Sequence, residues 1–272
     1  MNRKLLRVLE IVMAIVLVVS LAMVARTQIQ YTKGAETYEE AFDAARPPKL
    51  IVTPAPAVRE EMKENAEKEE AESEPDADPN LVLLAAMKID ELRQINSDVL
   101  GWITIPYTVI SYPILQTQDN DYYLKHTWQK ESGIVGSVFM DCRSSAELTD
   151  FNTIIYGHNM RDGSMFGTMS DYLEQEHWRE HPSVYLICGE VAYRYDIFAA
   201  FEASVTGPVY QFAELDVEER EAFIAECLAL SKIDTGIVPT ADDSILTLST
   251  CTGRGYQNRW VVQAVQAEVY AK

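Results

Sequence analysis

An uncharged apolar run near the N-terminus constrains the fold of this chain more than any other feature. Residues 11–25 carry no charge, and Ser20 is their only clearly polar residue. Counted over 5–25, a helix spans about 30 Å, close to the apolar thickness of a bilayer. Basic residues ahead of the run predict a cytoplasmic N-terminus. We therefore expect a cytoplasmic tip at 1–4, a single-pass signal anchor at 5–25 and the rest of the chain outside. A cleaved signal peptide, with small residues around Ser20, is the alternative.

The charge of the chain is unevenly distributed. A net charge of -19, from 23 basic and 42 acidic residues, separates into +4 over 1–35, -9 over 36–80 and -14 over 81–272. Such an acidic chain without a basic patch argues against nucleic-acid binding. The prolines and carboxylates over 26–80 predict an extracellular acidic stalk that holds a domain off the membrane. A partner-binding acidic tail is the alternative for this segment.

The last 192 residues, 81–272, predict one mainly β domain. Short β-rich runs bounded by Pro, Gly, Asn or Asp lie at 100–105, 108–112, 137–140, 153–156, 184–188, 191–201, 245–249 and 259–269. Eight strands in a compact region favour a closed or nearly closed barrel. Between strands six and seven, Asp216 and Glu219 have the spacing of a helix capping box. Apolar residues also recur at helical spacing over 81–95, which predicts a helix before the barrel.

One cysteine, Cys251, ends a strand on its more polar face, because side chains alternate along 245–251. The glycine-containing segment 252–258 predicts a reversal of the chain, so that Arg259 starts the next strand. If these strands pair, Cys251 and Arg259 are neighbours across the ladder, at roughly 5 Å between backbones. A guanidinium favours the thiolate and can hold a developing oxyanion. A buried structural cysteine beside an unrelated arginine is the alternative.

A histidine is the usual acid and base partner of a nucleophilic cysteine, and His158 is the best placed of the four. It follows an apolar strand and Gly157 and opens an irregular loop, which is typical of site residues on a scaffold. We expect the others, His126, His177 and His181, to be surface or capping residues.

The three remaining cysteines, Cys142, Cys188 and Cys227, are expected to pack structurally. With Cys251 they are too few and too widely spaced for a disulfide framework or a metal knuckle. We therefore predict no metal site, and we expect no cofactor.

Several motifs together resemble the sortases, the cysteine transpeptidases of Gram-positive cell envelopes, and most closely class B. The motifs are TLSTC at 247–251, Arg259 downstream, YGHNMRDGSMF at 156–166, VLGWI at 99–103 and DNDYYL at 119–124. The resemblance covers 81–272 and implies an eight-stranded sortase-type β-barrel, mainly β with α, with N-terminal helices and a helix between strands six and seven. We therefore expect 81–272 to be the catalytic domain.

The resemblance also implies the reaction. Cys251 would attack the carbonyl of a Thr in the C-terminal sorting signal of a surface protein, and His158 would act as general acid and base. Arg259 would hold substrate and oxyanion, while Ser249 and Thr250 would shape the substrate pocket. An amine of a peptidoglycan precursor or cross-bridge would then resolve the thioacyl enzyme.

Two alternatives to this function are a hydrolytic cysteine peptidase of the cell envelope and a membrane-tethered, non-catalytic binding module.

The chain departs from the family pattern at one position. The aspartate that some class B members carry between cysteine and arginine has no counterpart over 252–258.

Overall fold

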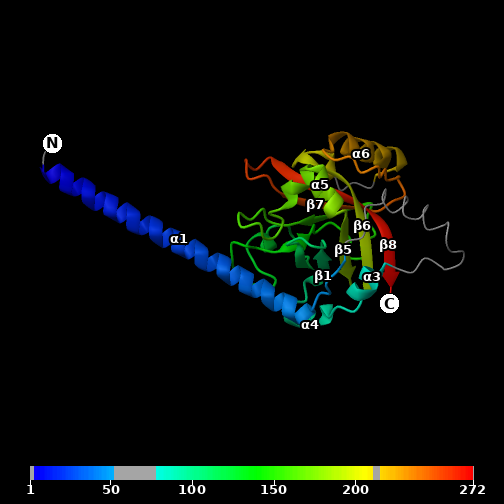
Figure 1. The fold of residues 1–272 in the computed structure, drawn as a ribbon, viewed down its shortest axis with the longest axis horizontal. Helices are drawn as coiled ribbons and strands as arrows, with labels where there is room; N and C mark the ends of the chain where they lie inside the picture. Colours follow the sequence, from blue (N-terminus) through cyan, green and yellow to red (C-terminus); the bar gives the residue numbers. More distant parts are fainter. Residues whose placement is uncertain (1–2, 52–77, 211–214, 272) are drawn as a thin grey trace, which may run out of the picture.

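The computed structural model describes residues 3–51, 78–210 and 215–271, which form a closed β-barrel and a long helix that projects from it (Figure 1). The barrel order is β1-β2-β3-β4-β7-β8-β6-β5. The strands are β1 (Val99–Thr104), β2 (Ser111–Leu115), β3 (Val138–Met140), β4 (Asn152–Tyr156), β5 (Ser183–Cys188), β6 (Val191–Ser204), β7 (Ile245–Cys251) and β8 (Asn258–Ala271). The predicted eight-stranded barrel is confirmed.

Two pairs of neighbouring strands in the barrel run parallel to each other. β2 pairs with β3 and β4 with β7 in parallel, whereas the other neighbouring strands are antiparallel. Both faces of β1 are covered, because Ile103 and its register partner Leu186 are buried on one face and Trp102 is buried on the other, where its ring meets Phe42 of α1. Parallel pairing matters for the site, because the ends of β4 and β7 lie at the same edge of the barrel.

The described helical elements are α1 (Arg3–Ala45), α3 (Pro79–Leu84), α4 (Ile89–Ile95), η1 (Tyr122–Leu124), η2 (Met169–Leu173), α5 (Gln175–Glu180), η3 (Pro208–Tyr210) and α6 (Val217–Leu230). The single helix expected over 81–95 is two short helices instead. The chain turns after Leu84, and the Lys88 amide donates to the carbonyl of Ala45 at the end of α1. This tertiary bond replaces the hydrogen bond that would have continued the helix.

The predicted helix between strands six and seven is α6. The Asp216 carboxylate accepts from the Glu219 amide, and the Glu219 carboxylate accepts from the Asp216 amide, which is a complete capping box. Phe223, Ile224 and Cys227 bury the inner face of α6 against the barrel. Figure 1 shows α6 on the outside of β6.

Helix α1 has two different halves. Its N-terminal half holds the apolar run, whose 18-residue window has a mean hydropathy of 2.3 and no side chain buried in the protein. Its C-terminal half packs on the barrel through Tyr38, Ala41 and Ala45, which belong to the main core cluster. The helix is continuous from the apolar run to the folded barrel.

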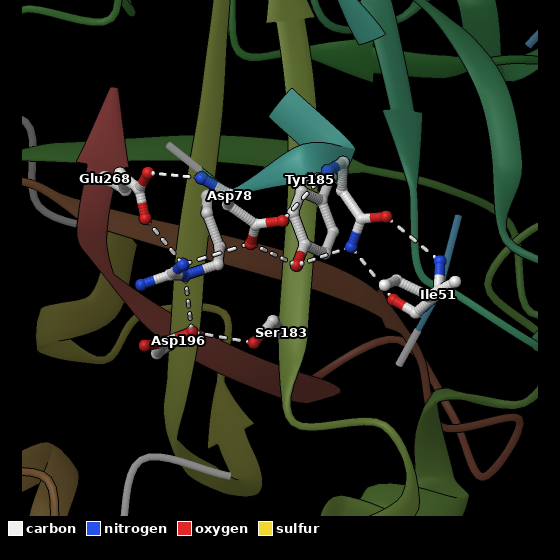
Figure 2. A network of polar contacts seen from close by, with 8 residues as sticks. Ile51, Asp78, Ser183, Tyr185, Asp196 and Glu268 are labelled. Carbon is white, nitrogen blue, oxygen red and sulfur yellow. Dashed lines mark hydrogen bonds and ion pairs between the residues drawn. The ribbon is translucent and has the colours of Figure 1, made fainter. Parts of the chain in front are cut away.

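The two ends of the acidic segment meet on the barrel (Figure 2). The Asn80 side chain accepts from the Ile51 amide at 3.0 Å and donates to the Ile51 carbonyl at 2.9 Å. The carboxylate of Asp78 is buried and accepts from Arg194 and from Tyr185. The part of the predicted stalk over 52–77 lies outside the described residues.

Candidate active site

Cys251 and Arg259 face each other at the open end of β7 and β8. The register of these antiparallel strands pairs Cys251 with Arg259, as the sequence predicts. The connecting loop reverses through Gly253 and Gly255, whose positive φ values of 73° and 125° favour glycine. Cys251 is half-buried, and Arg259 is partly exposed. The thiol is therefore at the rim, within reach of a ligand.

The parallel β4–β7 pair brings His158 to the same rim. The last register pair of these strands is Tyr156 with Ser249. His158 and Cys251 each lie two residues after a member of this pair. Hydrogen bonds extend the contact past β4, because Thr250 Oγ1 donates to the Gly157 carbonyl at 2.6 Å. Asn159 Nδ2 then donates to the Cys251 carbonyl at 2.7 Å. His158 thus lies between Gly157 and Asn159, each of which is hydrogen-bonded to a residue at the end of β7.

The imidazole of His158 has a defined hydrogen bond. Its Nε2 lies 2.7 Å from the carbonyl oxygen of Leu124, at the end of η1. A carbonyl oxygen only accepts, so Nε2 carries a proton, and in the neutral ring Nδ1 is the basic nitrogen. The ring packs against Gly136, where an added Cβ would lie 2.7 Å from Cδ2 of the imidazole.

The guanidinium of Arg259 is hydrogen-bonded to its own loop. Nη1 donates to the carbonyls of Tyr256 and Asn258, at 2.9 and 3.0 Å. These bonds hold the guanidinium at the loop that joins β7 to β8. A planar guanidinium has five donors in a fork, which suits it to bind a carbonyl or oxyanion there.

Ser249 and Thr250, the two expected pocket residues, are buried and bonded to protein groups. Thr250 joins β7 to Gly157, and Ser249 Oγ lies 2.7 Å from the hydroxyl of Tyr210. These two hydroxyls therefore join β7 to η3 and to the residue that follows β4.

Tyr210, in η3, is a residue that the sequence interpretation missed. Burial raises the pKa of its phenol to about 12, although the Ser249 hydrogen bond and the charge of Arg259 oppose the rise. Its hydroxyl is therefore a neutral donor or acceptor at the wall of the site. The Gly207-Pro208 pair just before it is the one local signal, because it predicts a turn after β6.

An acid from another strand reaches the loop between Cys251 and Arg259. The carboxylate of Glu202, in β6, accepts from Arg254 Nη2 at 2.8 Å and from Asn258 Nδ2 at 2.7 Å. Although the loop itself has no acid, it is tied to the barrel by this carboxylate.

The remaining histidines and cysteines lie in structural contacts. Nδ1 of His126 lies 2.8 Å from the carbonyl of Tyr122, and Nδ1 of His181 lies 3.0 Å from that of Pro106. Burial raises the thiol pKa of Cys188 and of Cys227 to about 12, which makes both poor nucleophiles. Cys142 and Cys251 are the two partly exposed cysteines, and of these Cys251 is the one at the edge of the barrel that Arg259 and His158 share.

Comparison with known proteins points in the same direction as the geometry. A family model described as a sortase domain matches residues 103–267. Sortase B of Listeria monocytogenes is 38% identical over 178 residues, which are 65% of this chain and 72% of that protein. A Staphylococcus aureus sortase B-substrate complex has a TM-score of 0.63 at 26% identity, covering 79% of this chain and 94% of that one. A structure of sortase B complexed with triglycine has a TM-score of 0.61 at 28% identity, with the same two coverages of 79% and 94%.

Proposed function

The chain belongs to the sortase family, as a class B cysteine transpeptidase, and we propose that Cys251, His158 and Arg259 carry out its reaction. One observation supports this assignment above the others. The strand register pairs Cys251 with Arg259 across the ladder, and the β4–β7 register leads His158 to the same edge of the barrel. Nucleophile, acid-base group and oxyanion donor are the three functions that acyl transfer through a thioester needs.

The first half of the proposed reaction forms a thioester. The Cys251 sulfur attacks the carbonyl carbon of the Thr in a sorting signal, and the C–N bond to the next residue breaks. His158 takes the proton of the Cys251 thiol and gives it to the leaving amine. Arg259 donates hydrogen bonds to the oxygen of the tetrahedral intermediate, where negative charge develops.

The second half transfers the acyl group. An amine attacks the thioester carbon, His158 accepts the proton of the amine, and the Cys251 thiolate leaves. Sortases act on sorting-signal substrates and on glycine amines, as the substrate and triglycine complexes of relatives indicate. For this chain we propose surface proteins with a sorting signal as donors and a peptidoglycan precursor or cross-bridge amine as acceptor.

The proposed setting of the enzyme is the outer face of the cell membrane. The apolar, exposed N-terminal half of α1 suits a single-pass anchor at 5–25, with residues 1–4 in the cytoplasm and the barrel outside. The catalytic domain over 81–272 would then stand close to substrates that are themselves held at the membrane. Residues 26–80 would connect the two, with the end of α1 packed on the barrel.

The proposal is tested with the full-length chain in detergent micelles and a fluorogenic sorting-signal peptide. Cys251→Ala abolishes cleavage and the thioacyl adduct seen by mass spectrometry, while the matched control Cys142→Ala leaves both intact. Addition of triglycine diverts the acyl group into a ligated product.

Three outcomes would contradict the proposal. Cleavage that survives Cys251→Ala removes the nucleophile. Hydrolysis without ligation to any amine indicates a peptidase, and a peptide that binds without forming an adduct indicates a binding module.

A further inference from the structure

Helix α1 contacts the catalytic barrel through specific polar bonds as well as apolar packing. The indole Nε1 of fully buried Trp128 donates to the Thr37 carbonyl at 2.7 Å. The ring of Tyr38 meets that of Tyr112 edge-on, at 5.4 Å between centroids. Gly34 lies so close to Val135 that any side chain at this position would collide with it. The end of α1 is therefore fitted to the segment just before Gly136.

The hydroxyl of Tyr38 reaches the backbone of that segment. It donates to the Gly136 carbonyl at 2.6 Å and lies 2.9 Å from Ser137 Oγ, both in buried surroundings. Burial raises the pKa of Tyr38, so its hydroxyl stays protonated and remains a donor. A neutral hydroxyl on a rigid helix is thereby bound to a residue that is 98 positions away in the sequence.

The segment that Tyr38 holds forms two sides of the His158 pocket. Gly136 lies against the ring, with an added Cβ only 2.8 Å from Nε2. The Leu124 carbonyl accepts from Nε2 on another side. The Ser137 amide donates to the Tyr123 carbonyl at 2.9 Å, which joins the two sides into one unit.

We propose that Tyr38 is a positioning residue for the transpeptidation, because its hydroxyl fixes Gly136 and thereby the ring of His158. The proposal rests on the assigned role of His158. Tyr38 itself touches no reacting atom. Its effect is to keep the imidazole in one orientation, with Nε2 bound to Leu124 and Nδ1 as the base. The helix that leaves the proposed membrane anchor is then part of the catalytic unit.

The test compares Tyr38→Phe with Tyr31→Phe in the full-length chain in detergent micelles. Tyr31 lies on the same helix and is partly buried against the core. The control therefore removes a tyrosine hydroxyl from the same helix, but not the one that is bound to Gly136. Turnover is expressed per folded protein, whose fraction is measured by near-UV circular dichroism, so that unfolded protein does not count. Because a misplacement of about 1 Å can cost about 100-fold in rate, we expect kcat to fall about tenfold in Tyr38→Phe. KM should stay near wild type, the thermal midpoint should fall by a few degrees because one buried hydrogen bond is lost, and Tyr31→Phe should behave as wild type.

A second readout is the tautomer of His158, measured by nitrogen NMR of labelled histidine and assigned with His158→Gln. Wild type should show the proton on Nε2, and Tyr38→Phe should show a mixture of tautomers. Wild-type kcat in Tyr38→Phe overturns the proposal, and so does a loss of kcat with an unchanged tautomer. If His158→Gln keeps wild-type turnover, the assigned function of His158 fails instead, which separates the two failures.

Discussion

Gly136 determines how closely the backbone can approach the imidazole of His158. Its φ of 59° lies in the left-handed region, and an added Cβ would lie 2.7 Å from both Cδ2 of His158 and the carbonyl oxygen of Tyr123. Gly136→Ala therefore brings two separate costs. The backbone strain should lower the free energy of unfolding by about 1–2 kcal/mol. Displacement of the imidazole should lower kcat more than tenfold, measured per folded protein.

Gly189 provides the matched control for this prediction. It has nearly the same φ, 61°, but no atom lies within 4 Å of an added Cβ. Gly189→Ala should show only the loss of stability that the backbone strain brings, with unchanged kcat. If both variants lose kcat equally, strain alone explains the effect and the contact between Gly136 and His158 does not matter.

The site shows which functional residues a sequence can reveal. Cys251 and Arg259 are predictable because strand alternation and a short turn are local rules, and β7 and β8 obey them. His158 is predictable in position, as a histidine at a strand end. The groups that orient His158 are not, because Leu124 lies 34 positions away and the Tyr38–Gly136 bond spans 98. Such contacts exist only once the barrel has closed.

Among the strands, β3 is held by a side chain more than by its own ladder. It has three residues and two register pairs with each neighbour. Directly after it, the fully buried carboxylate of Asp141 accepts from Arg143, Asn120 and the Tyr156 hydroxyl. Tyr156 is two residues before His158, so this carboxylate also braces β4 where the site begins.

Asp141→Asn should therefore weaken this region of the barrel. Burial would raise the pKa of Asp141, but hydrogen bonds from Arg143 outweigh it, and the net pKa lies below the ordinary 3.8. A lowered folded pKa means that the stabilisation is present above the unfolded value and is lost as pH falls through the folded one. At pH 7 we expect a loss of about 2–3 kcal/mol, because Arg143 is half-exposed and the pair is partly screened.

This prediction is measured by urea unfolding followed by tryptophan fluorescence at several pH values. The difference between wild type and Asp141→Asn should be constant from pH 7 to 5 and shrink below pH 3.8. A difference that grows on acidification would show that the carboxylate is not the stabilising form.

The elements as a whole followed the sequence closely, with two informative departures. The second strand was expected at 108–112 but lies at Ser111–Leu115, and it includes Pro113. A proline argues against a strand, yet this one is tolerated where β2 pairs with β1. The helix expected over 81–95 divides because Lys88 bonds to Ala45, a partner that no local pattern indicates.

At the scale of the whole molecule, α1 joins the proposed membrane anchor directly to the barrel. The helix is continuous over Arg3–Ala45, and its first partly buried core contact is Tyr31. Tyr31 lies only six positions after Ala25, the end of the apolar run, or about 9 Å along the helix. If 5–25 spans the bilayer as proposed, the site is held near the membrane at a defined height.

The acidic segment 52–77 is flanked by residues that are bound to each other. Ile51 is held by Asn80, and Asp78 is held by Arg194, whose guanidinium also pairs with Glu268. Arg194 and Asp78 are buried, so breaking the pair leaves an uncompensated charge. The barrel therefore has two attachments to α1 that do not run through 52–77: direct packing of the helix, and this polar cluster with Ile51.

Cleavage within 52–77 should consequently leave the protein assembled. We expect a variant with a protease site inserted there, reconstituted in liposomes and cut completely, to keep its barrel in the membrane pellet with wild-type sorting-peptide turnover. The matched control places the same site in α1 between Ala25 and Tyr31, where cleavage should release an active barrel into the supernatant. Release after cleavage in 52–77 would mean that this segment alone tethers the barrel, as a simple stalk would. Gel analysis of pellet and supernatant, with activity measured in each, separates these two outcomes.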